Sequence, residues 1–255
     1  MIRIARTLAG LGLVVGLLAG LALLAAGPAY RYGLWPLGTS FLMLRAAAYG
    51  GLAAALISAA GLILAPIYGH RRGMLRALAG VIVGLVVVGV PWSYWRTARA
   101  VPPIHDITTD PDDPPAFDAI LPLRAAAPNP AAYGGQEIAT LQRSAYPDIR
   151  PLAVGLPPER TFELALETAR AQRWQIVATE PQRRRIEASD QTFWFGFTDD
   201  IVVRITPAGT GSRVDVRSVS RVGKSDIGTN AARIRAYLDR LRAAAPAAGG
   251  GRSAG

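Results

Sequence analysis

The chain has no cysteine and only two histidines in 255 residues. The missing thiols exclude disulfides, thiolate metal sites and cysteine nucleophiles. His70 and His105 lie on either side of an apolar stretch long enough to cross a membrane, so a histidine-based metal site or catalytic triad is not expected. We therefore predict no metal and no cofactor.

Acidic residues are absent from the first 100 positions, which carry nine arginines. Between these arginines lie apolar stretches at residues 8–26, 46–68 and 77–95, each close to the ~20 residues of a membrane-crossing helix. The sequence predicts a membrane region of three transmembrane helices at residues 1–100. Because no Asp, Glu or His lies inside these stretches, we interpret the region as an anchor rather than a transport path.

The arginines also predict an orientation. Arg3 and Arg6 precede the first stretch, and Arg71, Arg72 and Arg76 lie between the second and third, so these ends share a side that the positive-inside rule marks as cytoplasmic. Three spans then place the C-terminal region outside the cytoplasm, in the periplasm of a bacterium. Aromatic residues gather at the opposite ends of the stretches: Tyr30, Tyr32, Trp35, Phe41, Trp92, Tyr94 and Trp95.

Two alternatives concern this membrane region. If residues 1–29 are a cleaved signal peptide, two spans remain and the C-terminal region stays on the same side. The net charge of +10 is typical of nucleic-acid binding only when it forms one patch, and here +9 belongs to the membrane region, so no nucleic-acid partner is expected.

Glycines repeat at four-residue spacing in two of the stretches. Gly12, Gly16 and Gly20 share one helix face, and Gly80 and Gly84 share another. Small residues at this spacing let membrane helices approach closely. We predict that these faces pack against helices, within this chain or between copies.

Residues 101–149 change character, with a net charge of −5 and eight prolines between positions 101 and 130. Proline blocks helices and central strands, so an extended acidic linker is predicted, with a short helix at residues 137–144. The acidic run does not have the spacing of a calcium-binding loop, and we interpret it as solvated rather than metal-binding. The residues weighed for a metal were His105, Asp106, Asp110, Asp112 and Asp113.

Residues 150–242 have the periodicity of a globular domain. Strands are predicted at residues 149–156, 174–179, 184–190, 193–206 and 213–221, and helices at 159–172 and 227–242. This order predicts an α+β domain, an antiparallel sheet with two helices on one face. Residues 243–255 are low in complexity and are predicted to be disordered.

Four motifs carry a resemblance to a known family. They are IHDITTD (104–110), PPAF (114–117), FWFGFTDDIVVRI (193–205) and SVSRVGKSDIGTNAARI (218–234). With them the chain resembles, from about residue 101 to 241, the bacterial family called domain of unknown function 1499. That resemblance implies no activity and no catalytic residue. The order of elements is also similar to helix-grip modules of cell-envelope lipoproteins, a weak basis for function.

The motif search yields one candidate surface and no catalytic motif. Gly223, Lys224 and Ser225 resemble the end of a phosphate-binding loop, but Ser218 stands where that loop requires glycine. Arginines near acids and aromatics are suited to gripping an anionic ligand, or they form an ordinary salt-bridged sheet face. The candidate ligand residues are Trp194, Asp199, Asp200, Arg204, Arg217, Arg221, Lys224, Asp226 and Asn230, with Phe195 beside them.

Three hypotheses of function follow. The first is a non-enzymatic, multi-pass inner-membrane protein that presents a periplasmic domain to an envelope protein or an anionic lipid. The second is a hydrolase-like enzyme that uses the Asp/Arg cluster, although adjacent acids on a strand point to opposite faces. The third is a scaffold that forms homo-oligomers through its membrane helices.

Overall fold

The computed structural model describes residues 2–67 and 71–245. The chain forms two compact units: Met1–Arg99 with Phe193–Gly196, and Ala100–Thr192 with Phe197–Gly255. His70, and the part of the predicted tail that follows Ala245, lie outside the described residues.

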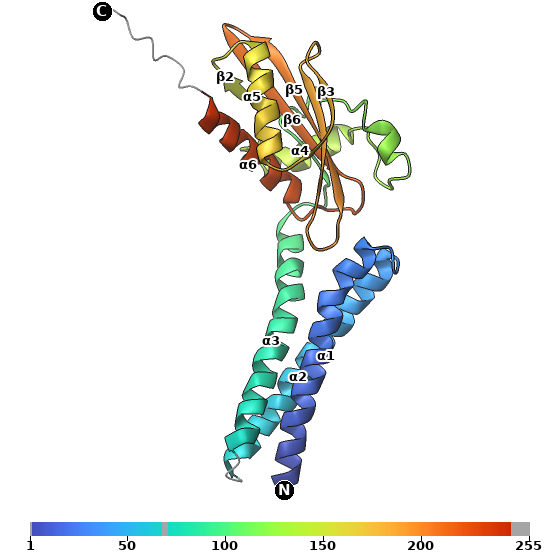
Figure 1. Cartoon of the computed structure of the whole chain (residues 1–255), viewed down its shortest axis with the longest axis vertical. Helices are drawn as coiled ribbons and strands as arrows, with labels where there is room; N and C mark the ends of the chain where they lie inside the picture. The colour runs from blue at the N-terminus through green and yellow to red at the C-terminus, as the bar shows by residue number, and fades with distance from the viewer. Residues whose placement is uncertain (1, 68–70, 246–255) are drawn as a thin grey trace, which may run out of the picture. The chain divides into compact units, whose positions relative to one another are not determined.

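The first unit contains the three predicted membrane helices, which the structure confirms. They are α1 (Ile2–Arg31), α2 (Leu37–Ile67) and α3 (Arg71–Ala100) (Figure 1). The segments Arg6–Arg31, Leu37–Leu64 and Gly73–Ala100 are long and apolar enough to cross a membrane. Each helix extends beyond its apolar stretch because the flanking residues are also compatible with helix.

The predicted packing glycines lie at contacts between these helices. Gly12 of α1 and Gly80 of α3 both lie against the side chain of Ser58 in α2. A Cβ atom built on Gly84 would be 2.5 Å from the carbonyl oxygen of Gly51 and 2.7 Å from the amide nitrogen of Ala55. These glycine faces are therefore covered by helices of the same chain.

The other two glycines of α1 also face α3. Cβ atoms built on Gly16 and Gly20 would meet the side chains of Val83 and Val87 at 3.2 and 3.5 Å. The glycine stripe of α1 thus contacts both neighbouring helices, as close packing in lipid requires.

The second unit contains a six-stranded antiparallel sheet. Its strands are β1 (Asp106–Thr108), β2 (Leu152–Val154), β3 (Gln175–Glu180), β4 (Arg185–Gln191), β5 (Thr198–Ala208) and β6 (Gly211–Ser220). Their order is β1-β6-β5-β4-β3, and β2 pairs with another part of β6. The helices are α4 (Gly135–Ala145), α5 (Pro158–Ala171) and α6 (Thr229–Ala244), with a 3-10 turn, η1 (Leu121–Arg124). The predicted α+β class is confirmed.

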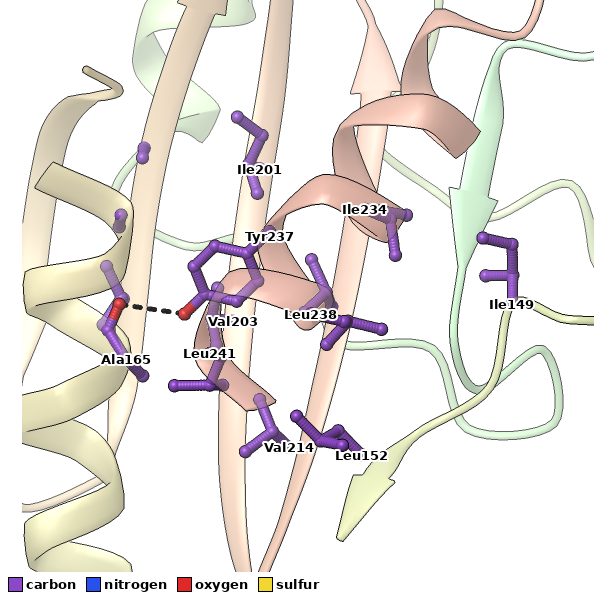
Figure 2. Packing of buried hydrophobic residues seen from close by; sticks show 14 of the residues in the cluster. Ile149, Leu152, Ala165, Ile201, Val203, Val214, Ile234, Tyr237, Leu238 and Leu241 are labelled. Carbon is purple, nitrogen blue, oxygen red and sulfur yellow. Dashed lines mark hydrogen bonds between the residues drawn. The ribbon is translucent and has the colours of Figure 1, made fainter. Parts of the chain in front are cut away.

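Helices α5 and α6 cover one face of the sheet (Figure 1). Ile201 and Val203 of β5 point into this core, which Figure 2 shows from close by. Tyr237 of α6 is fully buried there, and its hydroxyl donates to the carbonyl of Ala165 in α5 at 2.9 Å. Its ring stacks on Trp174 at 4.7 Å. The two helices are thus joined to each other as well as to the sheet.

Two strands are shorter at their N-terminal ends than predicted, and the one expected at 149–156 is limited to β2 (Leu152–Val154). The strand expected at 193–206 begins at Thr198, because the residues before it form the connection between β4 and β5. Gly196 in that connection has a φ of +68°, which takes the chain out of the extended conformation. The residues Phe193–Gly196 belong to the first unit.

The largest difference between prediction and structure is at residues 101–149, which were predicted to be an extended linker but are folded onto the sheet. Within these residues, β1 pairs with β6, and residues 109–134, called the arm from here on, lie on the sheet face opposite α5 and α6. Phe117 and Ile120 of the arm are buried against Val202 and Val219. The prolines do keep the arm free of long helices and strands, but its acid Asp110, and Asp106 just before it, are held by arginines of the sheet.

Candidate functional site

Strand alternation places a row of charged side chains on the face that the arm covers, called the arm face. Charged side chains are rarely buried in a protein unless each one is paired with a group of opposite charge. Three carboxylates of the row are almost fully buried, namely Glu187, Asp200 and Asp215. The arginines of the row are Arg185, Arg204, Arg217 and Arg221.

Glu187 fixes the middle of the arm to β4. Its carboxylate accepts the backbone N–H groups of Asp118 at 2.8 Å and Ile120 at 2.9 Å. Arg185 pairs with the same carboxylate at 2.8 Å. One buried acid therefore satisfies two arm amides and one guanidinium.

Arg217 contacts two separate segments of the arm and the strand that precedes it. It forms a two-pronged pair with Asp106 at 2.9 and 2.7 Å, and it donates to the carbonyls of Pro115 at 3.2 Å and Ala131 at 2.8 Å. Its guanidinium also lies 5.0 Å from the centre of the Phe117 ring. A two-pronged arginine–carboxylate pair of this kind is among the stronger polar contacts in proteins.

Asp200 serves two arginines at once. It pairs with Arg221 at 2.8 Å and with Arg124 of the arm at 3.4 Å, and it accepts the hydroxyl of Ser189 at 2.8 Å. Burial lowers the pKa of Arg124, and Asp200 opposes that shift. Together with the Arg217–Asp106 pair, this group holds three guanidiniums and two carboxylates, so it carries one surplus positive charge.

Arg204 belongs to a separate group at the other end of the row, in which two guanidiniums face three carboxylates. It lies 2.8 Å from Asp113 and 3.3 Å from Asp215, which in turn pairs with Arg213 at 3.0 Å. Asp110 completes this group. These arginines and acids form a salt-bridged sheet face. That was the alternative to a ligand site for the cluster predicted from the sequence.

Three more of the predicted residues lie on the opposite side of the sheet, beside or within α6, namely Asp199, Asp226 and Asn230. Asp199 pairs with Arg233 at 2.7 Å. Asp226 caps α6, because its carboxylate accepts the N–H groups of Gly228 at 2.8 Å and Asn230 at 2.7 Å. Burial raises the pKa of both Asp199 and Asp226. The predicted cluster is therefore divided between two faces of the sheet.

Because the pKa of Asp226 is raised in the folded protein, the free energy of unfolding should depend on the ionisation of this residue. Since burial raises the pKa of the folded state above the ordinary value, the contribution to stability is complete below about pH 4 and is lost as the pH rises through the folded pKa. Asp226→Asn removes the charge and keeps one of the two acceptor oxygens, and the loss of the other oxygen costs the same at every pH. We expect the free energy of unfolding of the variant, relative to the natural protein, to increase from pH 4 to pH 7. Urea titrations at both pH values measure this difference, and a constant difference would contradict it.

Two predicted residues lie away from both faces. Trp194 belongs to the first unit, where its indole N–H donates to the carbonyl of Leu24 at 3.3 Å. Lys224 is exposed in the loop between β6 and α6. Neither residue lies with the paired arginines of the arm face.

A hollow of about 300 Å³ opens beside Arg217, and we call it the Tyr133 hollow. The Tyr133 hydroxyl is buried and has no hydrogen-bond partner among the described residues. Burial raises the pKa of Tyr133 to about 12, so the hydroxyl keeps its proton at physiological pH. The hollow is lined by Pro114, Ala116, Phe117, Leu121, Ala131, Ala132, Tyr133 and Arg217.

A second, larger hollow of about 520 Å³ lies between the start of the arm and the end of α4. Asp112 pairs across it with Arg143, and Asp110 pairs with Arg213. Its charged groups are exposed to a greater degree than those around Arg217. A buried hydroxyl without a partner among the described residues does not distinguish the two hollows, since Tyr146 of the second hollow also has one. We regard the Tyr133 hollow as the better candidate because most of its lining is apolar.

Sequence reasoning found Arg217 but missed Phe117 and Tyr133. Both lie in the segment that was predicted to be linker. A signal was nevertheless present, because PPAF at 114–117 is one of the motifs that carry the family resemblance.

Acidic residues could act here in two ways, as a catalytic pair or as metal ligands, and the structure bears on both. Asp199 and Asp200 point to opposite faces, as adjacent strand residues do, so they do not act as a carboxylate pair. Within residues 2–67 and 71–245, no group of three or more His, Asp or Glu side chains is placed to hold a metal ion.

A family model described as "Protein of unknown function (DUF1499)" matches residues 106–241, more than half of the chain. The chain belongs to the DUF1499 family. The DUF1499 match begins at β1 and ends in α6, so it includes the arm and the Tyr133 hollow. The arm is thus part of the region that defines the family rather than a connection to it.

Comparison with other proteins adds little. The chain is similar to a crystal structure of the protein TTHA0849 from Thermus thermophilus, with 15% identity and a TM-score of 0.24. The match covers 38% of this chain and 97% of that one, and at this score it supports no conclusion about ligand or activity. No curated protein matches the chain.

Proposed function

We propose that this DUF1499 protein is a membrane-anchored, non-enzymatic binding protein of the bacterial cell envelope. The observation that carries the proposal is the Tyr133 hollow of about 300 Å³, whose lining combines apolar side chains with that of Arg217. Small-ligand sites in proteins are mostly apolar hollows with a few polar groups that fix the orientation of the ligand.

The buried acids of the sheet are already paired within the fold, and this favours a binding function over a catalytic one. Asp200, Asp199 and Glu187 each hold at least one arginine, and each is almost fully buried. A general base must be free to accept a proton from a substrate within hydrogen-bond reach. These acids instead accept hydrogen bonds from within the fold.

The placement of arginines in the sequence supports a location. Arg6 is the first residue of the span Arg6–Arg31, and Arg76 lies near the start of the span Gly73–Ala100, so the positive-inside rule favours a cytoplasmic location for both ends. We propose an inner-membrane protein with a cytoplasmic N-terminus and a periplasmic C-terminal unit. The ligand is then a component of the periplasm or of the membrane.

Native mass spectrometry of the full-length protein, released gently from its membrane, tests the binding function. We expect a non-covalent species that remains bound and leaves chemically unchanged when the protein is denatured. A bare protein mass under every release condition would contradict the proposal. Recovery of a chemically converted species would favour the hydrolase alternative, and a bare homo-oligomer would favour the scaffold.

A further inference from the structure

Three consecutive aromatic residues, Phe193, Trp194 and Phe195, belong to the same compact unit as α1, α2 and α3, and we call them the aromatic tip. The surrounding residues 191–198 (QTFWFGFT) contain no charged side chain. Phe195 is buried, and its ring lies 6.2 Å from that of Tyr30 and 6.1 Å from that of Phe41. Phe193, in contrast, is 92% exposed. The tip therefore has one side chain packed on α1 and α2 and another that is left exposed.

Helix α1 has a socket for Trp194, formed by Leu24, Gly27 and Pro28. In a regular helix the carbonyl of Leu24 accepts the N–H of residue 28, but Pro28 has no N–H. The indole N–H of Trp194 donates to this carbonyl at 3.3 Å. A Cβ atom built on Gly27 would be 2.6 Å from the indole ring, so a side chain there would displace it. In lipid, a carbonyl freed by proline needs another donor, and Trp194 supplies it.

The socket lies within the first span rather than beyond its end. The span Arg6–Arg31 has 26 residues, which as a helix measure about 39 Å, about 9 Å more than a hydrocarbon core of about 30 Å. Leu24 precedes Arg31 by seven residues, roughly 10 Å along the helix. Even if the whole excess length lay at this end, Leu24 would be at the edge of the core. Trp194 therefore reaches the depth at which headgroups meet acyl chains.

Arg31 holds Phe193 at the same interface. Its Nη1 donates to the carbonyl of Phe193 at 2.5 Å, and Arg31 is the last residue of the span. An exposed apolar side chain is not unusual by itself. Here, however, the next residue is fixed to a carbonyl inside a membrane-crossing helix. The surroundings of Phe193 are then lipid, into which the transfer of an apolar side chain from water is favourable.

We propose that the aromatic tip is a lipid-binding element, in which Trp194 holds the tip on α1 and Phe193 inserts into the bilayer interface. The partner is the boundary between headgroups and acyl chains in the leaflet that surrounds the end of α1. The contact is apolar, so zwitterionic lipid is sufficient. It is separate from the Tyr133 hollow and does not depend on the proposed ligand.

Site-directed spin labelling tests this inference. The natural chain has no cysteine, so Phe193→Cys creates a single labelling site at an exposed side chain. The full-length protein is placed in phosphatidylcholine nanodiscs, one copy in each. Collisions of the label with oxygen, which dissolves in lipid, are compared with collisions with a polar nickel chelate, which stays in water. We expect oxygen collisions to exceed nickel collisions at position 193.

Thr210→Cys is the control for a label in water. Thr210 is exposed in the turn between β5 and β6, and β5 separates this turn from Thr198 by about 34 Å. We expect nickel collisions to exceed oxygen collisions there. The same order at position 193 would overturn the inference. Low accessibility of position 193 to both reagents would overturn it as well, because protein rather than lipid would then cover the tip.

Two further variants, each combined with Phe193→Cys, test the socket. Gly27→Val should displace Trp194 and raise the nickel accessibility of the label several-fold, whereas Gly10→Val, in the same helix, should leave it unchanged because a Cβ atom there meets nothing within 4 Å. Trp194→Phe removes the indole N–H without adding bulk, and it should move the label in the same direction as Gly27→Val. Unchanged accessibility in both Gly27→Val and Trp194→Phe would mean that the socket does not hold the tip, which contradicts the proposal.

Discussion

Replacing Asp106 by alanine is expected to destabilise the second unit by about 3 to 5 kcal/mol. The change removes the acid that faces Arg217, a residue that is 2% exposed, and leaves its charge buried without that partner. The loss should appear as faster hydrogen exchange of the β6 amides, because Arg217 lies on β6 and β1 pairs with it.

Two control variants test whether the effect of Asp106→Ala comes from the burial of its ion pair. Asp239→Ala breaks an exposed pair with Arg242 on α6 and should change stability little. The double variant Asp106→Leu with Arg217→Met removes both charges and should recover much of the loss. The interpretation of the arm as a clamped part of the fold would be wrong if Asp106→Ala behaved like Asp239→Ala.

Replacing Gly84 by valine is expected to disrupt the packing of α3 on α2. A Cβ atom at this position would lie 2.5 Å from the carbonyl oxygen of Gly51, and a backbone atom inside a helix has little freedom to move. Overpacking of this kind costs typically about 1 to 3 kcal/mol, and more where backbone must shift. The measurement is the thermal unfolding midpoint of the full-length protein in detergent.

Gly89→Val is the matched control because it makes the same change in the same helix. A Cβ atom built on Gly89 meets nothing within 4 Å. We expect this variant to unfold at a temperature close to that of the natural protein, well above Gly84→Val. Equal midpoints for the two variants would mean that α2 and α3 do not approach each other at Gly84.

The sequence predicted the membrane helices and the helix face of the sheet because both depend on local periodicity. Long apolar runs define α1, α2 and α3, and Ile201, Val203 and Ile205 alternate along β5. The same rule placed Asp199 and Asp200 on opposite faces. These properties depend on neighbouring residues, so a single chain is sufficient to find them.

The arm could not be predicted in this way. The short strand β1 that precedes it has three residues, and Asp106 meets Arg217 across 111 positions of sequence. Prolines and acids are typical of a solvated linker unless distant arginines cover them. The candidate site depends on the same contacts: the sequence indicates a tyrosine at position 133, but whether its hydroxyl finds a partner among the described residues is a property of the folded arm.

The pairing of β1 also has a consequence for the order of folding. The strand that β1 joins, β6, ends at Ser220, so β1 has no partner strand until more than 100 further residues have been made. At roughly 5 to 20 residues per second, synthesis leaves the first strand of the second unit unpaired for several seconds or more. The segment that is synthesised first in this unit is thus completed late, and a chain interrupted before β6 would expose the acids of the arm together with Phe117 and Ile120.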